Sequence, residues 1–182
     1  MLERAERLLR ASPGTTLTAL VRLACQVRPE RPELAFDRLW LRLLGEEDMR
    51  FEEERPLTGA SIKLFAWTGG DGNAIGFLMD DPDVATDLRP IVKVYGCADA
   101  SDWEVVAANL GDFLSLVTIA CAEVISRTAT DDQFHAFRTE WYEAPDDLRE
   151  RDELASLLLA LPGVRTPESP RALVLRSSPR TW

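Results

Sequence analysis

The chain has 182 residues, of which 46% are hydrophobic and 29% are charged, and this composition is typical of a globular domain rather than of a disordered chain. We treat residues 1–182 as a single domain that buries its core without metal or disulfide staples. The formal charge of −10 repels phosphate backbones and anionic lipids, so nucleic-acid binding and membrane binding are disfavoured. The same charge would attract a basic protein partner, although many proteins are acidic for solubility alone.

The cysteines and the apolar segments bear on the compartment. Cys25, Cys97 and Cys121 are odd in number and widely spaced, which predicts neither a disulfide framework nor a zinc site and favours a reducing compartment. The N-terminus lacks the uninterrupted apolar segment of a secretory signal, and the longest apolar stretch, residues 113–125, is too short to span a bilayer. We therefore expect a cytoplasmic protein.

The N-terminal part of the chain predicts three helices. Residues 2–11 and 17–28 form the first two, separated by a Ser-Pro-Gly turn. The third runs from about Pro32 to Gly45, with its apolar stripe made by Leu39, Trp40, Leu43 and Leu44. An acidic connector follows at residues 46–54.

The middle of the chain predicts β-strands. Residues 62–67 and 74–79 are the arms of a hairpin, and three glycines in the loop between them supply the positive φ values of a compact turn. A charged loop over residues 80–89 leads to a third strand at 91–95. The short apolar run 172–176 is compatible with a fourth strand.

The second half predicts further helices. The longest covers about residues 102–126, with Ser101 and Glu104 as a capping box and a wide apolar stripe for packing on the sheet. Residues 131–142 and 147–161 form two more. The basic, proline-containing tail at 164–182 is expected to be loosely ordered towards its end.

Catalytic and metal-ligating patterns find little support in the sequence. His135 is the single histidine, and its position between two phenylalanines in a predicted helix is more typical of packing or of surface than of catalysis. No G-x-S-x-G, H-E-x-x-H or P-loop pattern occurs. We expect a protein that is not an enzyme and has neither a catalytic residue, a cofactor nor a metal site.

Asp71, in the glycine turn, admits other interpretations. The string Asp71-Gly72-Asn73 matches a fragment of a calcium loop, but the alternating acids that should follow are missing. The GGD string is similar to the hairpin signature of diguanylate cyclases. In that signature the fourth and fifth residues are acidic and aromatic, whereas here they are Gly72 and Asn73. We interpret Asp71 as a turn residue whose carboxylate accepts hydrogen bonds from backbone N–H groups. A small-ligand or metal-dependent enzyme centred on Gly69–Gly72 is the alternative.

Five residues near this turn are candidates for contact with a partner. Trp67 precedes the turn, and an aromatic side chain at the end of a strand can anchor an interface, although partial burial against the core is commoner. The charged loop contributes Asp80, Asp81, Asp83 and Asp87, which form either an ordinary solvated surface or the place where a basic partner binds.

Three segments in a fixed order resemble a known family. The run FAWTGGDGNAIGFLMD (65–80), the strand PIVKV (90–94) and the segment VVAANLGDFLSL (105–116) are similar to the SUKH superfamily of Smi/Knr-type domains. The resemblance covers about residues 60–120, with Thr68, Gly69, Gly70, Asp71 and Gly72 as the turn motif and a helix that opens with N-L-x-x-F-L at Asn109.

The resemblance implies a fold and a function. The fold is α+β, with helices packed on a curved antiparallel or mixed sheet and N-terminal helices before a central hairpin. The implied function is protein binding, since bacterial SUKH domains are associated with immunity against polymorphic toxins, including nucleases with basic clefts. We therefore expect a non-enzymatic binding protein whose partner is a protein, such as a basic toxin or a regulatory partner. Self-association through the apolar stripe of residues 102–126 is a further alternative.

Overall fold

The computed structural model describes residues 14–45, 62–69, 72–79, 83–96, 103–140, 142 and 144–176. These ranges confirm the prediction of an α+β fold. Its α-helices are α2 (Thr15–Val27), α4 (Leu110–Ile119), α5 (Asp131–Glu140), α6 (Pro145–Leu159) and α7 (Pro170–Arg176). The predicted helix at 2–11 and the acidic connector at 46–54 lie outside the described residues.

A five-stranded antiparallel sheet follows chain order. Its strands are β1 (Arg42–Leu43), β2 (Ile62–Trp67), β3 (Ala74–Leu78), β4 (Ile91–Val94) and β5 (Trp103–Ala107). The predicted hairpin is present, with Trp67 paired with Ala74 beside the turn, and the predicted third strand is β4. The register of β2 shifts between Leu64 and Ala66, where a bulge moves the following side chains to the other face of the sheet.

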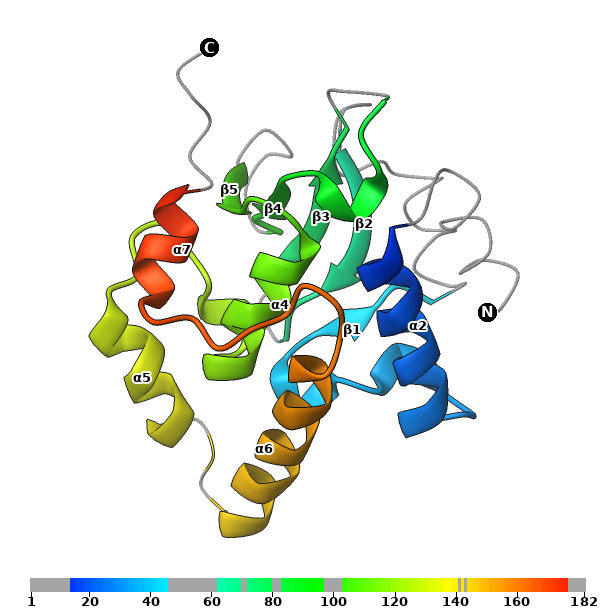
Figure 1. Ribbon diagram of the computed structural model, residues 1–182. Helices are drawn as coiled ribbons and strands as arrows, with labels where there is room; N and C mark the ends of the chain where they lie inside the picture. Colours follow the sequence, from blue (N-terminus) through cyan, green and yellow to red (C-terminus); the bar gives the residue numbers. More distant parts are fainter. Residues whose placement is uncertain are drawn as a thin grey trace.

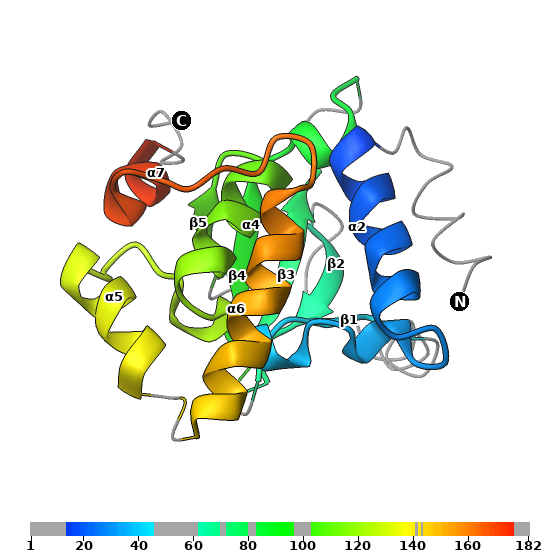
Figure 2. The same cartoon turned by 60° about the horizontal axis from the view of Figure 1, so that its bottom comes forward.

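The helices gather on one face of this sheet (Figures 1 and 2), with α2, α4 and α6 in front of the strands and α7 near β5. Helix α4 is central, because every residue from Leu110 to Thr118 except Asp112 is buried. The Phe65 ring lies 4.6 Å from the Phe77 ring and 6.2 Å from the Phe113 ring, which joins sheet and helix in one core. The opposite face carries a second buried cluster that includes Leu64, Val92, Val94 and Val105.

Helix α4 contains the central part of the apolar stripe on which the self-association alternative depends. That alternative required part of the apolar stripe at 102–126 to remain exposed. The apolar side chains of α4 are instead inside the domain's own core.

The predicted helix at 32–45 is wrong. Two 3₁₀ turns, Pro32–Leu34 and Asp37–Leu39, are followed by Trp40 in the left-handed conformation and by strand β1. Strand β1 pairs with β2, so Arg42 lies opposite Trp67 and Leu43 opposite Ala66. Pairing with a distant strand satisfies the backbone here, and a helical apolar pattern could not reveal it.

The predicted helix at 102–126 is also wrong in its first part. Residues 103–107 form β5, whose β-branched Val105 and Val106 suit a strand paired with β4. The helix begins only at Leu110, and its N-cap is Asn109, whose side chain accepts a hydrogen bond from Asp112 N at 2.8 Å. Glu104 lies in β5, so the proposed capping box does not form. The helix ends at Ile119, before a 3₁₀ turn at Ala122–Val124.

The C-terminal part differs from the prediction at residues 170–176, while residues 177–182, at the end of the predicted loosely ordered tail, lie outside the described residues. Residues 170–176 form helix α7 rather than a strand, because Ser169 caps its first turn by accepting a hydrogen bond from Ala172 N. Val164, Leu173 and Val174 are buried in the main core. The predictions at 17–28, 131–142 and 147–161 correspond to α2, α5 and α6 to within two residues at each end.

A buried arginine joins α6 to α4. Arg151 is 2% exposed, and its Nη2 donates to the carbonyl oxygen of Thr118 at 2.7 Å. A guanidinium at the C-terminal end of a helix satisfies a free carbonyl and complements the helix dipole. Among the helices described, none is long and apolar enough to cross a membrane.

Candidate functional site

The two ends of the hairpin loop are held together by local hydrogen bonds. Thr68 N donates to Asn73 O at 2.8 Å, and Thr68 Oγ1 lies 3.3 Å from the same oxygen. Both residues are buried, with exposed fractions of 3% and 6%, so their polar atoms need partners inside the protein. The loop is therefore closed at its base by a threonine and an asparagine.

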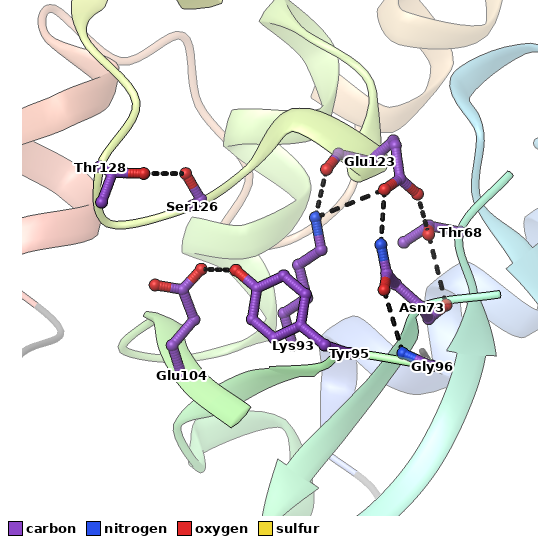
Figure 3. Close-up of polar contacts among 9 residues, drawn as sticks. All are labelled: Thr68, Asn73, Lys93, Tyr95, Gly96, Glu104, Glu123, Ser126 and Thr128. Atoms are coloured by element: carbon purple, nitrogen blue, oxygen red, sulfur yellow. Dashed lines mark hydrogen bonds and ion pairs between the residues drawn. The ribbon is translucent and has the colours of Figure 1, made fainter. Parts of the chain in front are cut away.

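Glu123, from a distant part of the sequence, supplies hydrogen-bond partners for these polar atoms (Figure 3). Its carboxylate accepts a hydrogen bond from Thr68 Oγ1 and another from Asn73 Nδ2, the latter at 2.6 Å. Asn73 Oδ1 in turn accepts a hydrogen bond from Gly96 N at 3.1 Å. One carboxylate thus fastens the base of the hairpin to the 3₁₀ turn that follows α4, and Asn73 connects it to the end of β4.

Lys93 completes this buried network. Its Nζ lies 3.7 Å from Glu123 Oε1, donates to the Glu123 backbone oxygen and lies 5.4 Å from the centre of the Tyr95 ring. Burial lowers the pKa of Lys93, and the charge of Glu123 opposes that effect. Tyr95 donates to Glu104, whose other oxygen accepts from Arg127 N at 3.1 Å. These groups satisfy one another, so we interpret the network as a structural support for the loop.

Cys121 lies next to this network but lacks the character of a nucleophile. It is buried, and burial raises the pKa of its thiol. A reactive cysteine needs the opposite shift, since the thiolate is the attacking species. Groups of three or more potential metal-binding side chains do not occur among the described residues.

A pocket of about 410 Å³ opens beside the hairpin turn, and we call it the turn pocket. Two segments that are distant in sequence line it: Asp37, Trp40 and Arg42 come from the first, and Trp67, Thr68, Gly69 and Gly72 come from the hairpin. Its volume is within the range of small-ligand sites.

Two tryptophans form part of the wall of the turn pocket, and one of them, Trp40, is held in position. Trp40 has φ 53°, and no other non-glycine residue of the described chain has a positive φ. A non-glycine residue in this conformation stores strain that the surrounding structure must hold, and such strain is frequent at functional sites. A Cβ on Gly69 would lie 2.0 Å from Trp40 Cε3, so glycine is required where the indole ring packs on the turn. Trp67, on the neighbouring strand, is half-buried.

Arg42 is the cation of the turn pocket. The strand register places it opposite Trp67, so the two side chains leave the same face of the sheet. Its Nε is buried and has no hydrogen-bond partner in the described part of the chain. Glu33 is a nearby anion: burial would raise its pKa, but hydrogen bonds to its own backbone and to Arg31, with the charges of Arg31 and Arg42, lower it overall.

Some of the predicted site residues lie together in the structure, and others lie outside its described part. Trp67, Thr68, Gly69 and Gly72 line the turn pocket, with Gly72 at φ 68° as a compact turn requires. Gly70, Asp71, Asp80 and Asp81 lie outside the described residues.

The two described aspartates of the charged loop differ from each other. Asp83 is exposed as expected. Asp87 is only 4% exposed, and its carboxylate accepts a hydrogen bond from Thr16 N at 3.0 Å. The expectation that Asp87 lies on solvated surface is therefore wrong: it caps the N-terminus of α2, where an anion satisfies a free N–H and complements the helix dipole.

Sequence reasoning missed Asp37, Arg42, Lys93 and Glu123, and it assigned Trp40 to a helix. The first segment was interpreted as a helix, which hid its approach to the turn. Lys93 did carry a signal, because it is the one charged residue in the apolar strand Ile91–Val94, and a strand buried on both faces forces such a side chain to find a partner.

Comparisons with known proteins leave the family open: no family model matches the chain, and no curated protein matches it either. The resemblance to the SUKH superfamily therefore stays a prediction.

Proposed function

We propose that this chain is a non-enzymatic, cytoplasmic protein-binding domain of SUKH type that acts as an immunity protein or as a regulatory partner. The observation that carries this proposal is the turn pocket, where Trp40 and Trp67 are half-buried at a concave site. Partly exposed tryptophans in a pocket are the side chains that most often dominate the energy of a protein interface. The partner would insert a side chain between or against these two rings.

The net charge supports a basic partner. At −10, the chain attracts a positively charged protein from a distance and speeds the encounter, while it repels nucleic acids. A nuclease toxin with a basic cleft has this complementary charge. The order of hairpin, strand and Asn109-capped helix supports the family resemblance, from which the immunity role is taken.

The experiment is a binding assay between the purified chain and the purified product of an adjacent gene. We expect a stable complex, and we expect W67A to weaken it by roughly tenfold or more. W103A is the matched control, because Trp103 is a tryptophan that is 39% exposed on β5 and does not line the turn pocket. A circular dichroism spectrum establishes that both variants are folded.

Two outcomes would overturn the proposal. Failure to capture any adjacent gene product would remove the immunity role. Equal affinities of wild type and W67A for a captured partner would remove the turn pocket as the interface.

The enzyme alternative has a separate test. A metal-dependent site needs several converging carboxylates, and among the described lining residues Asp37 is the one carboxylate. Stabilisation of the chain by divalent ions or nucleotides in a thermal-shift measurement would favour that alternative over ours.

A further inference from the structure

Arg42 has a buried donor that the described chain leaves unused. A guanidinium stays protonated at all physiological pH values, so its Nε always carries a proton to donate. That Nε is buried without a hydrogen-bond partner among the described residues, and other parts of the Arg42 residue line an open pocket of about 410 Å³. An unpaired buried donor costs about 1–3 kcal/mol, and a ligand that brings an acceptor recovers this cost.

The chemistry of the acceptor follows from the shape of the guanidinium. Its planar fork matches the two oxygens of a carboxylate, and such charge-assisted pairs are stronger than neutral hydrogen bonds. Trp40 and Trp67 lie in the same pocket and offer flat apolar surfaces to a ring. Because Gly69 and the left-handed backbone of Trp40 hold that indole in place, its ring is positioned before any ligand arrives.

We propose that the turn pocket binds an aromatic carboxylate, whose carboxylate group pairs with Arg42 and whose ring packs on Trp40 and Trp67. Two sources share this chemistry: a free aromatic amino acid and the C-terminal aromatic residue of a polypeptide. The inference does not rest on the proposed function, since a free amino acid would bind whether or not the chain has a protein partner.

Asp37 distinguishes the two sources. It is exposed and lines the same pocket, so its carboxylate is available to an ammonium group. A free amino acid has that ammonium beside its carboxylate, whereas the C-terminal residue of a polypeptide has a neutral amide there. Loss of the Asp37 charge therefore weakens the first ligand and leaves the second unchanged.

The test is calorimetric titration of the wild-type chain with L-phenylalanine, N-acetyl-L-phenylalanine and L-phenylalaninamide. We expect at least one of the two carboxylates to bind and the amide, which lacks the carboxylate, to bind roughly tenfold or more weakly. R42Q should weaken carboxylate binding to a similar degree. Arg22, which is exposed on α2 and does not line the turn pocket, supplies the matched control R22Q.

The variant D37N then assigns the source. A weaker affinity of D37N for L-phenylalanine than that of wild type supports a free amino acid. If the source is a polypeptide C-terminus, wild type should bind N-acetyl-L-phenylalanine more tightly than L-phenylalanine, and D37N should bind N-acetyl-L-phenylalanine as tightly as wild type does.

Three results would overturn the proposal. The first is no saturable heat with either carboxylate at millimolar concentration. The second is that the wild-type chain binds the amide as tightly as the carboxylates. This measurement needs only the wild type, so it is decisive even where R42Q fails to fold. The third is a folded R42Q with wild-type affinity.

Discussion

The indole ring of Trp40 packs directly on Gly69, so closely that a Cβ at position 69 would lie 2.0 Å from Trp40 Cε3. This contact connects a segment with an unusual backbone to the turn that gives the chain its most distinctive motif. It also explains the first glycine of the motif by close approach rather than by conformational freedom.

The contact predicts that G69A destabilises the protein by about 1–3 kcal/mol, because the new methyl group displaces the indole ring. Urea denaturation of wild type and variant measures the difference. In a W40A background the same substitution should cost much less, and an equal cost in both backgrounds would contradict the contact.

Gly72 provides the comparison, because its substitution should destabilise the protein for a different reason. A Cβ there meets nothing within 4 Å, but the residue has φ 68°. G72A should therefore cost about 1–2 kcal/mol through backbone strain alone, and G72N should recover part of it, since asparagine tolerates this conformation.

Glu123 and Lys93 form a buried pair whose separation should be costly. Their side chains are 12% and 4% exposed, so E123Q leaves a buried ammonium without its counter-charge. We expect E123Q to lower the free energy of unfolding by about 3–5 kcal/mol. In the double variant K93M/E123Q, urea denaturation should give a loss well below the sum of the two single losses. Strict additivity would show that the two groups act independently.

Asp87 should contribute to stability as a cap on α2. D87A removes the acceptor of Thr16 N, and we expect a loss of about 1–2 kcal/mol in urea denaturation. D83A, an exposed aspartate of the same loop, should change the stability by less than about 0.5 kcal/mol. Equal losses for D83A and D87A would contradict the capping role.

Asp131 should make stability depend on pH in the acid range. Its carboxylate accepts hydrogen bonds from Arg171 N at 2.8 Å and Ser169 Oγ at 2.9 Å, and the backbone hydrogen bond from Arg171 is the main cause of its lowered pKa. The unfolded carboxyl takes up its proton near its ordinary pKa of 3.8, whereas the folded one takes it up only at lower pH, so this contribution to stability is present above pH 3.8. It is lost as the pH falls through the folded pKa.

The measurement compares wild type with D131N in urea denaturation at a series of pH values. The stability difference should be largest near neutral pH and should shrink as the pH falls below about 3.8. D132N, at the exposed neighbouring residue, serves as the control. A difference between wild type and D131N that stays constant with pH would contradict this role of Asp131.

The elements that sequence reasoning located correctly have local causes. The hairpin of β2 and β3 follows from a glycine-rich turn between two apolar runs, and α2, α5 and α6 follow from apolar residues at helical spacing. The residues Trp67 and Thr68 were singled out for the same reason, because their place beside the turn is visible in a window of a few residues.

The elements that it misplaced are short apolar runs that suit a helix and a strand equally well. Residues 103–107 became a strand because β4 offers an edge to pair with, and residues 170–176 became a helix because Ser169 and Asp131 satisfy its first N–H groups. In both cases the hydrogen bonds that decide the structure have partners outside the apolar run, so the run alone does not reveal them.

The sequence by itself determined the α+β class, the hairpin and the glycines of its turn. Only the tertiary structure decided what that turn is used for. Pairing of β1 with β2 brings Arg42 beside Trp67, and packing of the 3₁₀ turn after α4 brings Glu123 beneath Thr68. The physical reason is that propensities and turn chemistry act over a few residues, whereas a pocket and a buried charge pair are made by strand pairing and burial between segments that local sequence does not link.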